Sequence, residues 1–542
     1  MTKARNEVQE AGGGRAGSPE LKFPRWQWWI PVVATVIFVG VCWATSGKKL
    51  MWGDEILTRL LVGSETTAGM LRGVASGIDG SPPVYWLLLR GWTRLVGTSD
   101  FALRVFSALA MSVAFAATWV LVRRLAGFTA ATVACSVVFF SNFLVFLQAT
   151  ECRHYPVVMA LLALTLLQFE RINRRAMVTR RDFFLYAGLV AALVLTHLFG
   201  FIFSGFILVA QLLADGAQRR FRPAFWLAIP CGWLAFLPWI PIFRVQSQIG
   251  KPWFWIEEPE VAVLADPYSY VFGISRFTLV AALVLIAFYP RLKKGSGASS
   301  NKIFRRRSWD RSDAPLVFAG VLLVVGVPIA TWVLSRVVQP MWLTRYQLPA
   351  VLGWAVLLGI GWRRLSVVSV GAAGRQLRWR LEHGLGAGLV AGCVLILGVR
   401  VWALPSRPAT GNLTTPGPVA VQGFDDFFYL ITYQPQLETY YVLDWPSALT
   451  SAEANRGYVA IHNIMAALKR NYPELRIIGG REFAERFSRF DFVEHGDSRL
   501  LRNWLAQFPD RTVISSMKQK WIMPNQTGVM VSQLVVRVEA KR

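Results

Sequence analysis

Long uncharged apolar runs recur along most of this 542-residue chain, and they constrain its fold more than any other feature. A membrane-spanning helix needs about 20 mostly apolar residues, and fewer where helices are short or broken. With 54% hydrophobic residues, the chain is too apolar for a soluble protein of this size. We therefore predict a polytopic α-helical membrane protein with about eleven spans, at residues 28–46, 101–122, 128–147, 156–169, 183–196, 198–214, 224–243, 276–290, 314–335, 347–361 and 385–403.

The basic residues indicate the orientation of these spans. The formal net charge of +26 is typical of a nucleic-acid-binding protein, but Arg and Lys cluster in short loops between the apolar runs. If the N-terminal segment 1–27, which we expect to be disordered, is cytoplasmic, every strongly basic loop falls on the cytoplasmic side, as the positive-inside rule requires. The distribution of positive charge thus indicates the membrane topology, with the N-terminus inside and the C-terminus outside. We therefore expect no nucleic-acid partner.

The chain divides into a membrane part, 28–403, whose first outer loop is 47–100, and a C-terminal part, 404–542, of ordinary soluble composition. We predict strands at 440–443, 476–478, 511–515 and 529–538, and helices at 461–470, 482–489 and 498–508. The C-terminal part should be a small extracytoplasmic α/β domain. Asp425 and Asp426 have no supporting constellation there and are predicted to lie on its surface.

The first outer loop opens with two adjacent acids, Asp54 and Glu55, directly after the first span. Acids at the end of a membrane helix are costly unless they face water, protein or substrate, so they form a functional hypothesis by default. The alternative is that they stabilise the first turn of a short interfacial helix. The pair alone does not decide between the two.

The predicted topology brings further acids, bases and aromatic residues to the same outer face. A carboxylate there can take a proton from an acceptor hydroxyl, and an Arg can hold a phosphate as it leaves. Aromatic rings suit sugar rings and equally suit a membrane-interface belt. The candidates are Asp54, Glu55 and Glu151 as catalytic acids, and Tyr85, Arg153, His154, Tyr155, Trp253, Trp255, Arg345 and Tyr346 as substrate contacts, with no metal ligands among them.

Each candidate has a plainer interpretation. Glu151 and Arg153 can simply neutralise each other at a helix end, and His154 and His197 are more often structural than catalytic. Trp253 and Trp255 suit the role of interface anchors as well as that of sugar platforms. Arg345 lies on the outer side, against the positive-inside bias, which favours a function.

Several motifs resemble one known family. Gly53-Asp54-Glu55, the run 81–88 (SPPVYWLL) and the run 100–104 (DFALR) resemble the first outer loop of the dolichyl-phosphate-mannose–protein mannosyltransferase and aminoarabinose transferase family, within the glycosyltransferase-C superfamily. The runs 151–155 (ECRHY) and 344–349 (TRYQLP) are similar to two further motifs of that family. One departure is Ser81, where many relatives carry His and the aminoarabinose branch carries Lys, so a basic phosphate contact is missing there.

The resemblance implies an inverting transfer of a sugar from a polyprenyl-phosphate donor at the periplasmic face of a bacterial inner membrane. It implies that Asp54 is the base, that Glu55 is its partner, that Glu151 is a second acid, and that Arg345 or Arg153 holds the lipid phosphate. The acceptor is a lipid, a glycan or a protein, and membrane lipids surround the chain. No cofactor is required by the sequence, which leaves open whether a divalent metal takes part.

Two rival hypotheses remain. A transporter or flippase of lipid-linked glycans should carry charged residues deep inside its helices and Gly/Pro-broken spans in two related halves. In this sequence most ionisable residues cluster outside the apolar runs, and no repeat is evident. In a non-catalytic scaffold, Asp54 and Glu55 would be dispensable.

Overall fold

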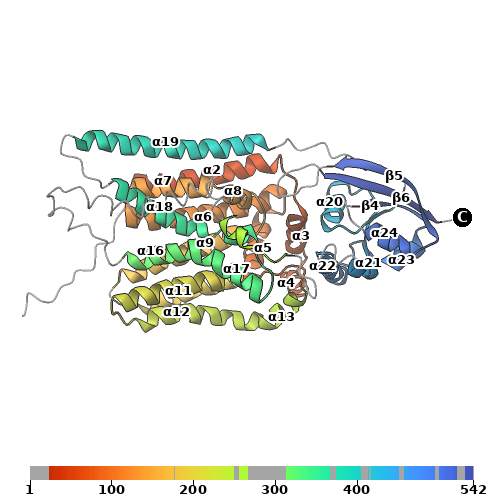
Figure 1. Ribbon diagram of the computed structural model, residues 1–542, viewed down its shortest axis with the longest axis horizontal. Helices are drawn as coiled ribbons and strands as arrows, with labels where there is room; N and C mark the ends of the chain where they lie inside the picture. Colours follow the sequence, from red (N-terminus) through yellow and green to blue (C-terminus); the bar gives the residue numbers. More distant parts are fainter. Residues whose placement is uncertain are drawn as a thin grey trace, which may run out of the picture.

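The computed structural model describes residues 24–249 except 176, 256–266, 313–366, 374–404, 413, 415, 417–450, 457–494, 500–521 and 531–540. The expected span 276–290 and the candidates Trp253 and Trp255 lie outside the described residues. The described chain forms a bundle of long helices at one end of the molecule and an α/β domain at the other (Figure 1).

The bundle contains seven described helical segments that are long and apolar enough to cross a membrane, or eight if a bent pair is one span. This confirms a multi-pass membrane protein, whereas the number eleven stays a prediction. The bundle elements are η1 (Arg25–Trp28), α2 (Trp29–Ser46), α6 (Asp100–Ala126), α7 (Phe128–Phe140), α8 (Phe143–Ala149), α9 (Tyr155–Asn173), α10 (Arg180–Val194), α11 (Gly200–Ala217), α12 (Pro223–Trp233), η2 (Leu234–Trp239), α13 (Ile240–Gln248), η3 (Val261–Ala265), α16 (Ala314–Val321), η6 (Leu322–Gly326), α17 (Val327–Val337), η7 (Thr344–Gln347), α18 (Ala350–Ser366) and α19 (Gly374–Ala403).

The expected single span 128–147 is broken into α7 and α8, which meet at a bend of 72°. The break falls at Asn142, whose side-chain oxygen accepts hydrogen bonds from the backbone N–H groups of Leu144 at 2.8 Å and Val145 at 3.3 Å. Asn is a strong helix N-cap, so it starts a new helix inside an otherwise apolar run.

The basic loops meet at one end of the bundle. Arg124 pairs with Glu170, and Arg174 pairs with Glu170 and with Asp313 at the start of α16. Arg222 reaches Asn173 at 2.8 Å. These contacts join loops that are far apart in the sequence, and they agree with the predicted gathering of basic loops on one side.

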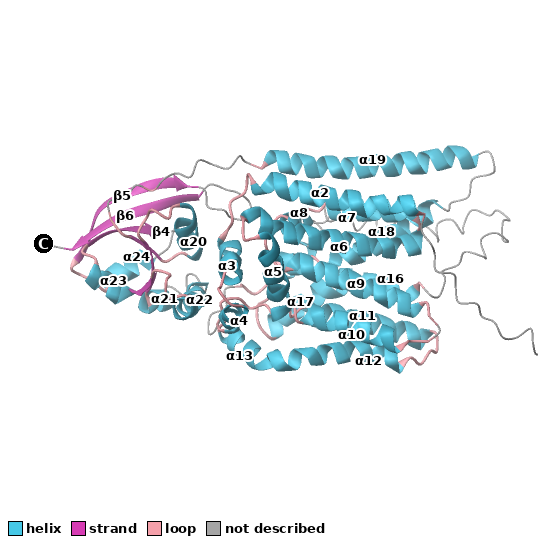
Figure 2. Ribbon diagram, turned by 180° about the vertical axis from the view of Figure 1, so that it is seen from behind, coloured by secondary structure: helices cyan, strands magenta, loops and turns pink. Residues whose placement is uncertain are grey.

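The first outer loop lies at the other end of the bundle. It folds into three short helices, α3 (Gly53–Val62), α4 (Thr67–Ala75) and α5 (Pro83–Val96). In Figures 1 and 2, α3 lies across the ends of the long helices, between them and the α/β domain. One buried hydrophobic cluster includes side chains of both the loop and the domain, among them Leu57, Leu61, Phe428 and Leu468. The loop is therefore packed on two sides.

The C-terminal domain is built on a six-stranded sheet of order β3-β2-β1-β4-β6-β5. β1 to β4 are parallel, and β6 runs antiparallel to both β4 and β5. Its elements are β1 (Val419–Val421), α20 (Phe424–Tyr433), β2 (Thr439–Leu443), α21 (Trp445–Thr450), α22 (Gly457–Asn471), β3 (Ile477–Gly479), α23 (Gly480–Arg486), β4 (Arg489–Glu494), α24 (Leu500–Ala506), β5 (Arg511–Trp521) and β6 (Val531–Ala540). The predicted fold class, a polytopic helical protein with a small α/β domain, is thus confirmed.

Two predictions in this domain were wrong. The helix expected to reach residue 489 ends at Arg486, because Phe490 and Phe492 are buried in the core of the sheet as part of β4. Asp426, expected on the surface, is buried.

Candidate active site

Glu55, in the first turn of α3, is fully buried against Arg104 of α6. Nε and Nη2 of Arg104 donate to the two carboxylate oxygens at 2.8 and 2.7 Å, and the backbone N–H of Cys152 donates to Oε1 at 2.9 Å. Burial alone would raise the pKa of Glu55, but the charge and hydrogen bonds of Arg104 outweigh burial and hold it below its usual range. Glu55 thus joins α3, α6 and the loop before α9.

Asp54, its neighbour, remains 24% exposed and faces Arg153. Nη2 of Arg153 lies 3.3 Å from Asp54 Oδ2, and Nη1 lies 3.7 Å from Asp79 Oδ2. Burial would lower the pKa of Arg153, but the charges of Asp54 and Asp79 raise it above its usual range. Asp54 is therefore an open carboxylate beside a fixed cation.

Glu151 is buried and paired with Lys49, whose Nζ donates to Oε1. Gln148 Nε2 donates to the other oxygen at 3.2 Å. Lys49 was missed at the sequence level, although a lysine that follows the first span on the outer side departs from the positive-inside bias. Asp79 and Arg104 were not among the candidates either, although Arg104 closes the family-like run 100–104 and Asp79 lies in the first outer loop.

Two stacked histidines lie behind Ser81. The rings of His154 and His197 are 4.8 Å apart, and Ser81 Oγ lies 3.5 Å from His154 Nδ1. Burial, together with the nearby guanidinium charges, lowers the pKa of His154 well below its usual value and that of His197 to about 3. Both imidazoles are therefore neutral near pH 7. Tyr85 packs its ring against His154, at 5.8 Å between centroids.

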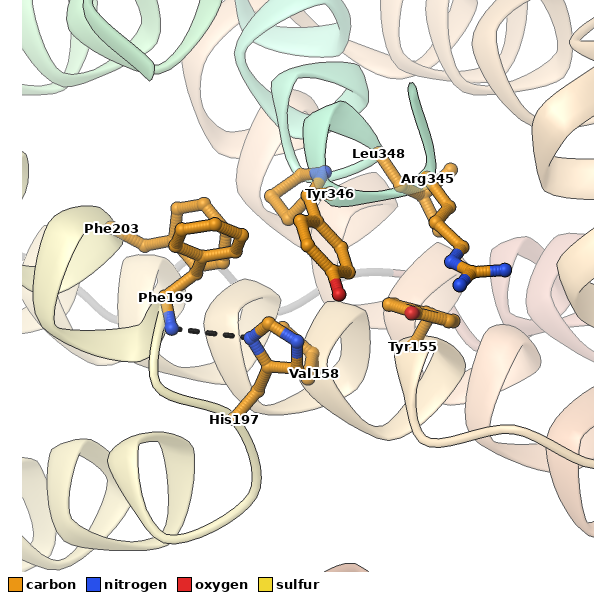
Figure 3. Close-up of a pocket in the computed structure, with 9 residues that line it drawn as sticks. Tyr155, Val158, His197, Phe199, Phe203, Arg345, Tyr346 and Leu348 are labelled. Carbon is orange, nitrogen blue, oxygen red and sulfur yellow. Dashed lines mark hydrogen bonds between the residues drawn. The ribbon is translucent and has the colours of Figure 1, made fainter. Parts of the chain in front are cut away.

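A small pocket lined by aromatic side chains begins at His197 (Figure 3). Tyr346 packs against Phe199, His197 and Tyr155, with ring centroids 4.7, 5.2 and 6.0 Å apart. The guanidinium carbon of Arg345 lies 5.9 Å from the centroid of the Tyr155 ring. The Nε of Arg345 is buried and has no hydrogen-bond partner in the part of the chain that the structure describes. Among the described residues, the pocket thus presents the guanidinium of Arg345, with its Nε free of hydrogen bonds, above an aromatic ring, which suits an anionic group attached to an apolar or sugar moiety.

The structure joins most of the predicted residues into one chain of contacts. Asp54 pairs with Arg153, whose sequence neighbour His154 packs against Tyr155, and the Tyr155 ring in turn contacts both Tyr346 and Arg345. Glu55 and Glu151 lie beside this chain, each with a cation of its own. Within the described ranges, no group of three or more His, Cys, Asp or Glu side chains could hold a metal ion.

Comparisons with known proteins agree with this geometry. Residues 80–242 match the profile of the dolichyl-phosphate-mannose-protein mannosyltransferase family. The fold is similar to that of ArnT from Cupriavidus metallidurans in the apo state, with 15% identity, 94% of this chain and 97% of that chain covered, and a TM-score of 0.58. The same ArnT bound to undecaprenyl phosphate gives 15% identity, coverages of 94% and 98%, and a TM-score of 0.56. No curated protein sequence matches this chain.

The resemblance expected from the motifs is confirmed. The matched segment contains Glu151, Arg153 and both stacked histidines. This chain is therefore a multi-pass membrane protein with an ArnT-like fold, and its residues 80–242 match the dolichyl-phosphate-mannose-protein mannosyltransferase family.

Proposed function

We propose that this protein is a membrane glycosyltransferase that moves a sugar from a polyprenyl-phosphate donor to an acceptor hydroxyl. The observation that carries the proposal is a single connected wall of side chains. At one end the partly exposed carboxylate of Asp54 is held by Arg153, and at the other Arg345, whose Nε has no hydrogen-bond partner within the described residues, lies over Tyr155. The family match and the likeness to a protein that binds undecaprenyl phosphate support the class of donor.

In this proposal, Asp54 acts as the general base. Its carboxylate takes the proton of the acceptor hydroxyl while the hydroxyl oxygen attacks C1 of the sugar. The bond between C1 and the phosphate oxygen breaks, and the phosphate leaves with the electron pair. A guanidinium such as that of Arg345 can stabilise the leaving phosphate by paired, charge-assisted hydrogen bonds. Attack opposite the leaving group inverts the configuration at C1.

The other candidates take supporting roles. Both oxygens of Glu55 and both oxygens of Glu151 accept hydrogen bonds from protein groups, which favours positioning over proton transfer. Tyr155 and Tyr346 offer ring faces for the sugar or for the first isoprene units. His154 and His197, being neutral, add no charge to the phosphate site.

The orientation follows from the basic end of the bundle. By the positive-inside rule this end faces the cytoplasm, so Asp54, the pocket and the α/β domain face the periplasm of a bacterial inner membrane. A donor anchored by its lipid chain would enter at the level where the long helices end.

The test is transfer by the purified protein in liposomes, supplied with a panel of polyprenyl-phosphate sugars and a membrane extract as acceptor source. We expect one donor to be consumed, with one polyprenyl phosphate released for each sugar transferred. A fluorescent lipid-phosphate sugar in the same vesicles measures translocation. Translocation without transfer of any sugar would replace the transferase by a flippase.

A further inference from the structure

The N-terminus of α3, which carries Asp54, is capped from the C-terminal domain. The N-cap residue is Trp52, whose indole has no acceptor, so the first N–H groups of the helix need acceptors from elsewhere. Gly53 N–H donates to Asp425 Oδ1 at 3.1 Å, and Met51 N–H donates to the hydroxyl of Tyr433 at 2.7 Å. Both acceptors belong to α20, some 370 residues further along the chain.

The approach of α20 to α3 leaves no space at Gly53. A Cβ atom at that position would lie 2.3 Å from Asp425 Oδ1 and 2.7 Å from the ring of Phe424. Any larger residue would displace the Asp425 carboxylate and the Phe424 ring from their present positions. Glycine thus allows the close contact between the two helices.

Contacts beyond this point dock the domain along the rest of the loop. Ser64 Oγ and the Tyr472 hydroxyl are 2.8 Å apart, and Asn471 Nδ2 donates to Ser76 Oγ at 3.0 Å. The shared hydrophobic cluster adds apolar contacts between the loop and the domain. The docking therefore does not depend on Asp425 alone, and loss of that side chain should leave the domain in place.

We propose that Asp425 is a positioning residue for Asp54, so that the C-terminal domain forms part of the transferase site; this rests on the proposed role of Asp54. The backbone of Asp54 is held on one side by Arg153, whose Nη1 lies 3.4 Å from its carbonyl oxygen. On the other side it follows directly after Gly53, which Asp425 holds. A catalytic group displaced by about 1 Å can lose about 100-fold in rate, so this restraint is worth a substantial part of the turnover.

Two substitutions of Asp425 separate the effect of its hydrogen bond to Gly53 from the effect of its negative charge. Asp425 is exposed on α20, but its carboxylate loses part of its hydration against α3, and this loss together with the Asp54 charge raises the pKa of Asp425 to about 6. Asn at this position keeps an acceptor oxygen for Gly53 N–H and removes the charge. Ala removes both.

The first experiment compares the transfer kinetics of Asp425→Ala, Asp425→Asn and Glu485→Ala, the last an exposed acid on α23 that serves as control. We expect Asp425→Ala to lower kcat about 10- to 100-fold, in line with loss of a hydrogen bond to a charged group, with little change in the donor KM. Asp425→Asn should stay within about threefold of wild type, because its amide oxygen still accepts the hydrogen bond from Gly53 N–H. Glu485→Ala should stay within the same range, because Glu485 is exposed on α23. Wild-type kcat in Asp425→Ala, or equal damage in both Asp425 variants, would overturn the proposal.

The second experiment uses hydrogen exchange of peptides that cover residues 51–56 and needs no turnover. Exchange should become faster in Asp425→Ala and stay unchanged in Asp425→Asn. A loss of kcat without faster exchange would also contradict a positioning role. If Asp54→Asn retains full activity, the proposed role of Asp54 as the general base is wrong. Faster exchange in Asp425→Ala would then still show that Asp425 caps α3, but the cap would have no catalytic consequence.

Discussion

Arg104 and Glu55 form an ion pair in which neither side chain is exposed to solvent. Arg104 also donates to the carbonyl oxygens of Lys49 at 2.7 Å and Leu50 at 2.9 Å, so its guanidinium holds the segment that leads into α3. The pair therefore fixes the start of the first outer loop from the membrane side, as α20 does from the domain side.

Glu55→Gln should destabilise the protein strongly. It leaves the Arg104 charge buried without a counter-ion, and breaking one partner of a buried pair costs about 3–5 kcal/mol. The matched control is Asp100→Asn in the partly exposed Arg59–Asp100 pair, which should cost only about 0–1 kcal/mol. Thermal unfolding in detergent measures both. Equal effects in the two variants would contradict a structural role specific to Glu55.

Arg345→Gln should weaken binding of a polyprenyl phosphate. A hydrogen bond to a charged group is worth about 1.5–3 kcal/mol, so the affinity should fall about 10- to 100-fold. Lys at this position should recover only part of the affinity, because it lacks the planar fork of donors. Arg336→Gln, on the exposed side of α17, is the control. Binding of undecaprenyl phosphate to the purified protein is the measurement, and unchanged affinity would remove Arg345 from the phosphate site.

Lys49 and Glu151 should act as one unit. Lys49→Met and Glu151→Gln should each lower stability by about 2–3 kcal/mol, because each leaves a buried charge without its partner. The double variant should lose less than the sum of the two single losses, which a double-mutant cycle from thermal unfolding detects. Additive losses would mean that the two side chains do not interact.

The buried histidines should make the protein less stable in mild acid. The pKa of His197 is about 3 in the folded protein and about 6.5 in an unfolded chain, so the unfolded state binds the proton first as the pH falls. The stability that neutral His197 contributes is complete above pH 6.5 and is lost as the pH falls toward 3. His197→Asn should therefore show a smaller drop in Tm between pH 7 and pH 5 than wild type. His383→Asn, at the basic end of the bundle, should behave as wild type; an equal drop in all three proteins would refute this account.

Much of the architecture could be predicted because short stretches of the sequence determine it. A long apolar run specifies a membrane helix by its length. Clustered Arg and Lys residues indicate an orientation, which stays a prediction. The bend at Asn142 was not predicted, because one polar residue inside an apolar run does not reveal that its side chain caps a new helix. The strand β4 was not predicted, and the helix expected over 482–489 was extended to its first residue, because helical and strand patterns adjoin there without a turn signal.

The candidate site was predictable only in part. The family-like motifs, taken in their order along the chain, indicated Asp54, Arg153 and Arg345. They did not indicate which acidic side chains form ion pairs with which basic ones. Lys49 and Glu151 are 102 residues apart, and Gly53 and Asp425 are 372 apart. Such contacts depend on how helices and domains pack, and no local pattern encodes them. The roles of Asp54, Glu55 and Glu151 in catalysis stay predictions.

The most direct test of the central claim is sugar transfer by wild type and Asp54→Asn with the donor that the panel identifies. General-base catalysis typically contributes about 10²- to 10⁴-fold, so the isosteric amide should reduce turnover by that factor. Donor binding should stay within about threefold of wild type, because the phosphate contacts remain. The transferred sugar should have the anomeric configuration opposite to that of the donor. Full activity in Asp54→Asn, or retention of configuration, would contradict the proposed mechanism.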